Sequence, residues 1–357
     1  MGRAGVEVFK WPKNLLKRLI AFQEAKRFNK PSGCLLNMEE GSSIWTEKYR
    51  PKTFADIKGQ DEIVAKLSAF VKQRNIPHLL LAGPPGVGKS TIALVLARAF
   101  FGENYRENFL ELNSSDERGI DVVRNKVKDF ARTKALGDVP FKIIFLDECD
   151  ALTKEAQQAL RRTMENYTAT CRFILAANYS SKIIDPIQSR CAVFRFRPLP
   201  KEKVYELIDH VVKGEGLNMD QKAKDALVLI ADGDCRRVNN VLQSCAAISP
   251  TITSENIYSL ASMAESSQVK EVLVAAMKGD FQLARNKLLD IMLRYGLSGV
   301  DIIKQIQAEV WNLEVDGRKK VVLIDKCGEI EFRMVEGADE FIQLEALLAQ
   351  FMLAGPQ

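Results

Sequence analysis

Residues 79–91 read Leu-Leu-Leu-Ala-Gly-Pro-Pro-Gly-Val-Gly-Lys-Ser-Thr, an apolar run followed directly by the phosphate-loop pattern G-x-x-x-x-G-K-[ST]. A buried strand that ends in these glycines turns successive backbone N–H groups toward an anion. The helix expected over residues 90–101 offers its positive N-terminus to the same phosphates. A glycine-rich turn that fits the pattern by chance is the alternative, but strand, loop and helix occur in the required order. The sequence therefore predicts a nucleoside triphosphate site.

In such a site the Lys89 ammonium reaches the β and γ phosphates, and the Ser90 hydroxyl binds Mg²⁺. A second apolar run, residues 141–146, ends in Asp147-Glu148-Cys149-Asp150. We expect Asp147 to help hold Mg²⁺ and Glu148 to polarise the attacking water, although a solvated strand end is the alternative. The loop residues predicted to contact ATP are Gly83, Pro84, Pro85, Gly86, Val87, Gly88, Lys89, Ser90 and Thr91.

Apolar runs alternate with helical periodicity through the first half of the chain, which predicts a parallel α/β layer. Strands are expected at residues 79–82, 109–113, 143–147, 172–177 and 192–196. From residue 201 the pattern becomes purely helical. We predict an extension over residues 1–37, an α/β domain over 38–200, a small helical domain over 201–266 and further helices over 267–357.

Composition excludes several classes of protein. No apolar stretch approaches the roughly 20 residues that cross a bilayer, so we expect a soluble protein without membrane contact. The seven cysteines include no C-x-x-C pair, which argues for reduced intracellular thiols and against a zinc module. The chain has two histidines, His78 and His210, so a histidine-based triad or metal centre is not expected. His78 lies just before a strand, and we expect it to be structural.

The net charge of +5 is unevenly distributed. Residues 1–37 carry eight basic and two acidic side chains, a net +6, which leaves −1 for residues 38–357. A basic arm that touches DNA or lipid is one interpretation. We favour another, in which Met38 is the true start and the extension is disordered or not made. Mass spectrometry that found a peptide from residues 13–30 would refute it.

One predicted helix, residues 119–132, combines a core-facing stripe with a basic side. The apolar positions are Ile120, Val123, Val127 and Phe130. Arg124, Lys128 and Arg132 recur every four residues, and Arg118 lies near the helix start. We predict that Arg118, Arg124 and Lys128 contact DNA phosphates without reading bases. The alternative is an ordinary solvated basic face.

The sequence resembles the small subunits of the replication factor C sliding-clamp loader, within the AAA+ ATPases, and most of all those of the archaeal type. The resemblance runs from about Trp45 to the C-terminus. Besides the phosphate loop and the Asp147–Asp150 box, it rests on residues 45–51 (Trp-Thr-Glu-Lys-Tyr-Arg-Pro), 113–119 (Asn-Ser-Ser-Asp-Glu-Arg-Gly), 159–165 (Ala-Leu-Arg-Arg-Thr-Met-Glu) and 189–191 (Ser-Arg-Cys).

The resemblance implies an AAA+ module with a five-stranded parallel sheet flanked by helices, a small helical lid and a C-terminal all-helical collar. It implies that Asn178 is sensor 1 and that Arg236, on the lid, is sensor 2. Tyr49, Arg50 and Pro51 resemble the segment that packs around the adenine. Arg190 resembles an arginine finger: it lies far from its own phosphate loop and would act in trans, on the ATP of a neighbouring subunit.

The function implied by the resemblance is an ATPase subunit that opens a sliding clamp and loads it onto primed DNA during replication. The implied cofactors are ATP and Mg²⁺. The implied partners are the large subunit, other copies of the small subunit, proliferating cell nuclear antigen as the clamp, and primer–template DNA. The implied location is the cytoplasm of an archaeal cell, at the nucleoid during replication.

Two rival interpretations remain open at this point. A branch-migration helicase or an origin-binding initiator would need its own winged-helix DNA domain, for which the helical C-terminus offers no candidate. A member of the family that binds ATP only as structural glue should lack the carboxylate or the finger, and this chain has both Glu148 and Arg190.

Overall fold

The computed structural model describes residues 44–115, 123–135, 141–261 and 263–355, without the side chains of residues 103, 123 and 124. The basic extension (residues 1–37), the predicted start at Met38 and the predicted DNA contact Arg118 lie outside the described residues. No helix within the described ranges is long and apolar enough to cross a membrane.

Five parallel strands form the main sheet of the described residues, in the order β2-β3-β4-β1-β5. Their bounds are β1 His78–Ala82, β2 Phe109–Asn113, β3 Lys142–Asp147, β4 Cys171–Ala177 and β5 Cys191–Arg195. Each bound agrees within one residue with the sequence-based expectation. Because the strands are parallel, their C-terminal ends meet at one edge, where Ala82 pairs with Ala177 and Asn113 with Asp147. The predicted five-stranded parallel layer is confirmed.

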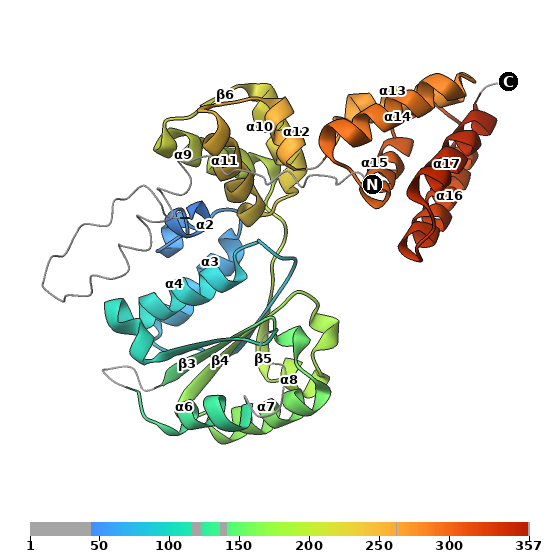
Figure 1. Cartoon of the computed structure of the whole chain (residues 1–357). Helices are drawn as coiled ribbons and strands as arrows, with labels where there is room; N and C mark the ends of the chain where they lie inside the picture. Colours follow the sequence, from blue (N-terminus) through green and yellow to red (C-terminus); the bar gives the residue numbers. More distant parts are fainter. Residues whose placement is uncertain (1–43, 116–122, 136–140, 262, 356–357) are drawn as a thin grey trace, which may run out of the picture. The chain divides into compact units, whose positions relative to one another are not determined.

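Alternate side chains of the strands pack on opposite faces of the sheet, as the two-residue period of a strand requires. Leu79, Leu81 and Phe145 join one apolar cluster, whereas Leu80 and Ile144 join another. Figure 1 shows α4 on one side of the strands and α6 and α7 on the other. The helices of this region are α2 Trp45–Lys48, α3 Asp61–Lys72, α4 Lys89–Phe101, α6 Lys128–Arg132, α7 Lys154–Asn166 and α8 Asp185–Gln188. Burial on both faces explains why the central strands β1, β3 and β4 read as nearly continuous apolar runs, whereas the edge strands β2 and β5 are only partly buried.

The chain after residue 200 is mainly helical, as predicted. Its helices are α9 Lys201–Glu215, α10 Gln221–Ala231, α11 Cys235–Ile248, α12 Ser254–Leu260, α13 Ser266–Met277, α14 Phe281–Tyr295, α15 Gly299–Val310, α16 Gly317–Val335 and α17 Glu340–Ala354. The purely helical expectation was wrong at two short strands, β6 Asn218–Met219 and β7 Thr251–Ile252, which pair with each other. Two-residue strands are too short to leave a periodic pattern in the sequence.

One apolar cluster of buried side chains extends from Leu199 to Phe351. The predicted boundary at residue 266 falls within the span of this cluster, so the division of the chain into domains remains a prediction.

The helix predicted over residues 119–132 differs from the structure. Val123–Val127 is a π-helical segment, followed by the short α6, and residues 119–122 lie outside the described ranges. A π-helix bonds residue i to i+5, so it shifts the alignment of side chains by one residue per turn. The side chain of Arg124 is outside the described part of the chain, so a shared basic face of Arg124, Lys128 and Arg132 stays a prediction.

His78 is structural, as expected. It lies in β1, and its Nδ1 accepts a hydrogen bond from the backbone N–H of Phe173 at 3.1 Å. Burial, assisted by the Arg172 guanidinium, lowers the pKa of His78 from 6.5 to about 4. The unfolded chain therefore binds a proton here at a higher pH than the folded chain does.

The pKa difference at His78 predicts a pH-dependent loss of stability. As the pH falls from about 6.5 to about 4, this group should remove about 3 kcal/mol from the free energy of unfolding. In His78→Asn the amide oxygen can still accept the Phe173 N–H but does not titrate. We expect urea titrations to show a smaller loss across this range for the variant than for the wild type. Equal losses in the two proteins would contradict the assignment.

Candidate functional site

The phosphate loop lies where β1 ends and α4 begins, beside a cavity of 620 Å³. Gly86 and Gly88 adopt left-handed backbone angles, with φ of 72° and 97°. A Cβ on Gly86 would lie 1.8 Å from Oδ1 of Asp234, so this position has no room for a side chain. The loop therefore brings its backbone close to the cavity, where N–H groups can bind phosphate oxygens.

Lys89 connects the loop to the neighbouring strand. Its Nζ donates to the carbonyl oxygens of Gly83 and Pro84, each at 2.7 Å, and to Oδ1 of Asn178 at 2.9 Å. Burial lowers the pKa of Lys89, while the nearby Asp147 carboxylate acts in the opposite direction. The ammonium has three N–H donors, and all three have acceptors within the protein. A phosphate entering this site would replace carbonyl and amide acceptors with charged oxygens, which form stronger hydrogen bonds.

Ser90 and Asp147 form the part of the cavity suited to a metal ion. The Ser90 hydroxyl donates to Oδ2 of Asp147 at 2.6 Å, and Oδ1 of the same carboxylate accepts the Glu148 N–H at 2.9 Å. Adjacent ligands of an octahedral Mg²⁺ lie about 3 Å apart, given metal–oxygen distances near 2.0–2.1 Å. Hard oxygen donors at this spacing fit Mg²⁺, whose remaining positions are usually filled by phosphates and water.

Glu148 follows β3 in a left-handed conformation, with φ of 50° and ψ of 39°. Such angles cost a residue with a side chain about 1 kcal/mol, and they are retained mostly where a function requires them. The Glu148 side chain is half-buried and lines the cavity beside Asp147 and Asn178. Its carboxylate is therefore placed on the side of the cavity where the phosphate end of a nucleotide would lie.

Asp150 holds the backbone that carries Asn178. Its carboxylate accepts the N–H groups of Asn178 at 3.2 Å and Tyr179 at 3.4 Å, directly after β4. The predicted sensor residue is thus fixed from its backbone by Asp150, and its side chain contacts Lys89. Sequence reasoning identified the Asp150 position only as part of a motif.

Tyr49 lines the cavity and packs against the helix α9. Its hydroxyl donates to Oε1 of Glu215 at 2.7 Å, and its ring meets His210 edge to face at 5.6 Å. Burial and the hydrogen bond to Glu215 raise the pKa of Tyr49, which keeps the phenol neutral. Arg50 pairs with Glu47 at 3.1 Å, and Pro51 also lines the cavity. An aromatic ring between apolar and polar groups is suited to a nucleotide base.

Helix α11 approaches the phosphate loop with its N-terminus. The Cys235 N–H donates to the Gly86 carbonyl at 3.1 Å, and Asp234 caps the helix by accepting the N–H groups of Arg236 and Arg237. Arg236 is exposed and lines the cavity. A cation on the helix that touches the loop can therefore respond to the charge of a bound phosphate.

Arg190 lies at the other end of the strands. It immediately precedes β5, in which Cys191 pairs with His78 at the start of β1. The phosphate loop follows the last residue of β1, so the length of that strand, about 16 Å at 3.3 Å per residue, separates the two. Arg190 does not line the cavity. The structure therefore keeps Arg190 apart from the phosphate loop of its own chain.

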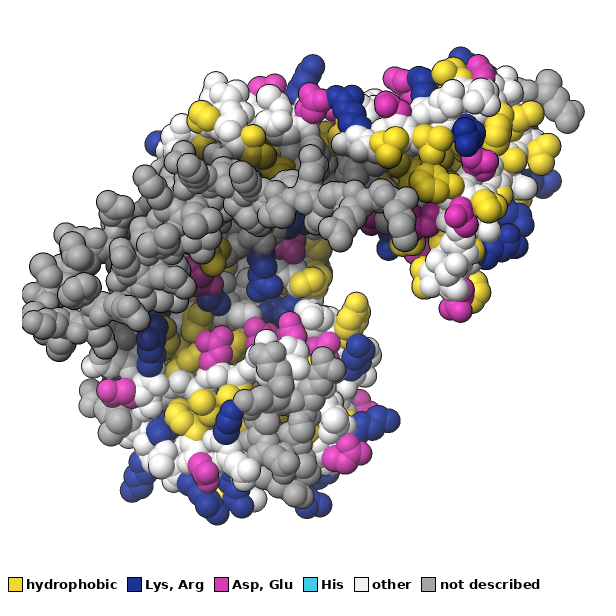
Figure 2. Space-filling view, viewed as in Figure 1, with side chains coloured by type: hydrophobic (Ala, Val, Ile, Leu, Met, Phe, Trp, Pro, Cys, Tyr) yellow, Lys and Arg dark blue, Asp and Glu magenta, His cyan; other side chains and the backbone are white. Residues whose placement is uncertain are grey.

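The predicted DNA contacts are only partly described. Arg118 is outside the described residues, Arg124 is described without its side chain, and Lys128 is a half-buried residue at the start of α6. Figure 2 shows Lys and Arg side chains interspersed with Asp and Glu on the visible face. This mixture of signs agrees with the net charge of −1 for residues 38–357. The assignment of a DNA surface stays a prediction.

The structure adds residues that sequence reasoning missed. Leu207, His210 and Asn239 line the cavity, and Glu215 binds Tyr49. All four come from α9 and α11, more than a hundred residues after the phosphate loop. Their positions in the helices carry no local signal of a ligand site, because ordinary helix surfaces show the same residue types.

The fold and this cavity define the chain as a member of the AAA+ class of ATPases. A family model described as "ATPase family associated with various cellular activities (AAA)" matches residues 79–199. The solved structure of the Thermotoga maritima RuvB Holliday junction branch migration motor has a TM-score of 0.50 and 18% identity, covering 64% of this chain and 78% of that one. At this identity the likeness concerns the fold alone.

Closer relatives specify the family. Proteins named replication factor C small subunit are 54% identical in Methanocella arvoryzae, 51% in Archaeoglobus fulgidus and 52% in Staphylothermus marinus. Each match covers 87% of this chain and at least 95% of the relative. A model of the replication factor C C-terminal domain matches residues 264–350. The chain belongs to the replication factor C small-subunit family.

Proposed function

We propose that this chain is an ATPase subunit of a clamp loader, which opens a sliding clamp and places it around primed DNA during replication. It would assemble with further copies of itself and with a replication factor C large subunit. The clamp would be proliferating cell nuclear antigen, and the DNA would be a primer–template junction. The site of action would be the nucleoid, in the cytoplasm of an archaeal cell.

The placement of Arg190 carries this proposal. The cavity holds the groups expected to bind ATP and position water, yet the cation that resembles an arginine finger precedes β5, at the opposite ends of the strands. A site that needs this guanidinium must take it from another protomer. Contacts of this head-to-tail kind build rings or open spirals. Such an assembly can change shape with nucleotide state, which suits the opening of a ring-shaped clamp.

Nucleotide binding would use two groups of residues that line the cavity. The base would lie near Tyr49, Arg50 and Pro51, while loop residues 83–91 and Lys89 would hold the phosphates. Mg²⁺ at Ser90 and Asp147 would neutralise charge on the phosphate oxygens. Arg236 would bind the phosphates from the lid. These contacts would fix the orientation of α11 against the phosphate loop and so couple the nucleotide to the conformation of the subunit.

Hydrolysis would use groups from two protomers. Glu148 would orient the attacking water and accept its proton, and Asn178 would hold that water against the γ-phosphate while contacting Lys89. Arg190 of the next copy would stabilise charge on the transferred phosphoryl group. Turnover would then require assembly, and release of the closed clamp would follow the loss of the γ-phosphate.

DNA would enter the central space of the assembly. Arg118, Arg124 and Lys128 would contact phosphates of the duplex, which favours primer–template shape over base sequence. Binding should weaken as salt increases, because each phosphate contact releases condensed counterions.

A clamp-loading experiment tests the proposal directly. The complex of this chain with the large subunit should retain labelled clamp on primed circular DNA in an ATP-dependent manner, and cutting the circle should release the clamp. Clamp and primed DNA together should stimulate ATP turnover, and added salt should reduce the stimulation. ATP turnover that ignores clamp and primed DNA but responds to a four-way junction would instead support a branch-migration motor.

A further inference from the structure

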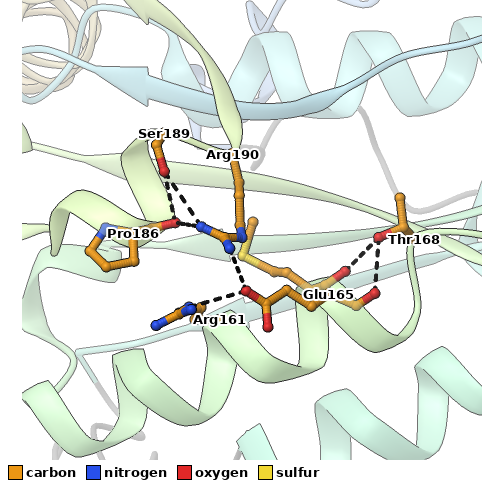
Figure 3. Close-up of polar contacts among 7 residues, drawn as sticks. Arg161, Glu165, Thr168, Pro186, Ser189 and Arg190 are labelled. Atoms are coloured by element: carbon orange, nitrogen blue, oxygen red, sulfur yellow. Dashed lines mark hydrogen bonds and ion pairs between the residues drawn. The ribbon is translucent and has the colours of Figure 1, made fainter.

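Three charged side chains form a cluster where α7 approaches the start of β5. Nη2 of Arg190 lies 2.5 Å from Oε1 of Glu165, and Nε of Arg161 lies 3.1 Å from the same oxygen. Arg161 and Glu165 are four residues apart on α7, whereas Arg190 comes from the turn before β5. Figure 3 shows the two guanidinium groups converging on one carboxylate.

Arg190 is also held by the turn that carries it. Its Nη1 donates to the Pro186 carbonyl at 2.7 Å and approaches the Ser189 hydroxyl at 3.5 Å. A guanidinium has five N–H donors, and these contacts leave at least two of them available. The Arg190 side chain retains 35% of its exposure. The guanidinium is thus oriented from one side and open to an incoming anion from the other.

The backbone beneath Glu165 is fixed as well. The Thr168 hydroxyl donates to the carbonyl of Met164 at 2.8 Å and to that of Glu165 at 3.3 Å. Both carbonyls lie in the last turn of α7, where intrahelical partners are missing. Hydrogen bonding from Arg161 and the charges of both arginines lower the pKa of Glu165, so the carboxylate stays ionised near neutral pH.

We propose that Glu165 is a positioning residue for the arginine finger Arg190. Its carboxylate holds the guanidinium in the orientation in which the next protomer's ATP meets it. This inference rests on the proposed function, in which Arg190 acts in trans.

The exposure of the pair indicates orientation rather than stability as its role. Exposed ion pairs add little to the stability of a fold, and Arg190 and Glu165 retain 35% and 38% of their side-chain exposure. A free arginine, in contrast, samples many rotamers, and a misplaced catalytic group loses much of its effect. A weak contact that selects one orientation therefore affects the rate of hydrolysis more than the fold.

Arg161 explains how the finger can engage phosphate without leaving an unpaired carboxylate. If Arg190 turns part of its contact toward a phosphate, Glu165 keeps the bond from Arg161. An acidic residue with two basic partners can give up one at low cost. The cluster also keeps a net positive charge, since two guanidinium groups share one carboxylate, and this favours the approach of an anion.

The test uses the assembled complex with clamp and primed DNA and compares four small-subunit variants: Glu165→Gln, Arg190→Ala, the double variant and Glu155→Gln. We expect Glu165→Gln to lower kcat for ATP by roughly three- to tenfold with KM unchanged, because the contact orients a group that acts in the transition state. In the Arg190→Ala background, Glu165→Gln should have no further effect. Glu155 is an exposed carboxylate on the same helix, it has no ion pair to Arg161 or Arg190 within the described residues, and its substitution should change nothing.

Three outcomes would overturn the inference. An equal loss from Glu165→Gln in the presence and absence of Arg190 would show a structural role. A rise in kcat would show that Glu165 restrains the finger, and an unchanged kcat would show that the contact is idle. If Arg190→Ala itself leaves turnover intact, the proposed trans site is refuted. A result that contradicts only the Glu165 variant refutes the positioning role alone, so the two failures are distinguishable. Thermal unfolding of each variant excludes loss of the fold as the cause.

Discussion

Glu148→Gln should bind ATP as tightly as the wild type and hydrolyse it about 10²- to 10³-fold more slowly in the assembled complex. The amide has the size of the carboxylate but cannot accept a proton from water. Glutamine also meets the same left-handed backbone requirement at this position, so the strain at residue 148 is unchanged. The contacts of Lys89, Ser90 and Asp147 remain, which is why binding should persist.

Glu111→Gln provides a matched control. Glu111 lies on β2, two residues before the strand ends, and pairs in register with Phe145 rather than with a residue of the carboxylate box. The substitution Glu111→Gln removes the same charge as Glu148→Gln, but from the neighbouring strand. A general electrostatic effect would therefore appear in both variants. We expect near-normal turnover from Glu111→Gln, measured as phosphate release with saturating clamp and primed DNA. Normal turnover in Glu148→Gln would remove Glu148 from the mechanism.

Much of the α/β layer could be predicted because its three central strands, β1, β3 and β4, are buried on both faces. Runs such as residues 79–82 and 143–147 are almost entirely apolar, and each ends at glycine or acidic residues. Burial of this kind depends on the residues of the run itself and therefore leaves a local signal. The same reasoning located Lys89, Ser90, Asp147 and Glu148, since parallel strands bring their C-terminal ends to one edge.

Contacts between distant segments could not be predicted in this way. The pair Tyr49–Glu215 joins residues 166 positions apart, and the Cys235 N–H meets the Gly86 carbonyl from the helical region. Each depends on how one element packs against another, and nothing in the local sequence distinguishes Glu215 from other acidic residues on helix surfaces. The π-helical turn at Val123–Val127 is a similar case, because the apolar spacing there also fits an α-helix.

Arg190→Ala should lower ATP turnover of the assembled complex by about 10³-fold or more, since arginine fingers contribute about 10³ to 10⁵ in rate. Binding of ATP should change little, because the Arg190 guanidinium acts on charge that develops on the transferred phosphoryl group, while Lys89 and the phosphate loop still hold the nucleotide. Lys89→Ala should also be inactive, for the different reason that it loses a phosphate contact within its own cavity. Each variant thus lacks one half of a composite site.

Co-expression of the two variants distinguishes sites shared between protomers from sites completed within one. A protomer with Arg190→Ala keeps an intact cavity, and a neighbour with Lys89→Ala keeps an intact finger. Random assembly of equal amounts should therefore restore about one quarter of the composite sites between small subunits, and a measurable part of the turnover. If each site were completed within its own chain, every protomer in the mixture would carry a defect and no activity would return. Mixed complexes that are confirmed by two affinity tags but lack turnover would therefore refute the trans site. Because Arg190 is separated from the phosphate loop of its own chain, a role in hydrolysis requires that it act on the nucleotide of a neighbouring protomer.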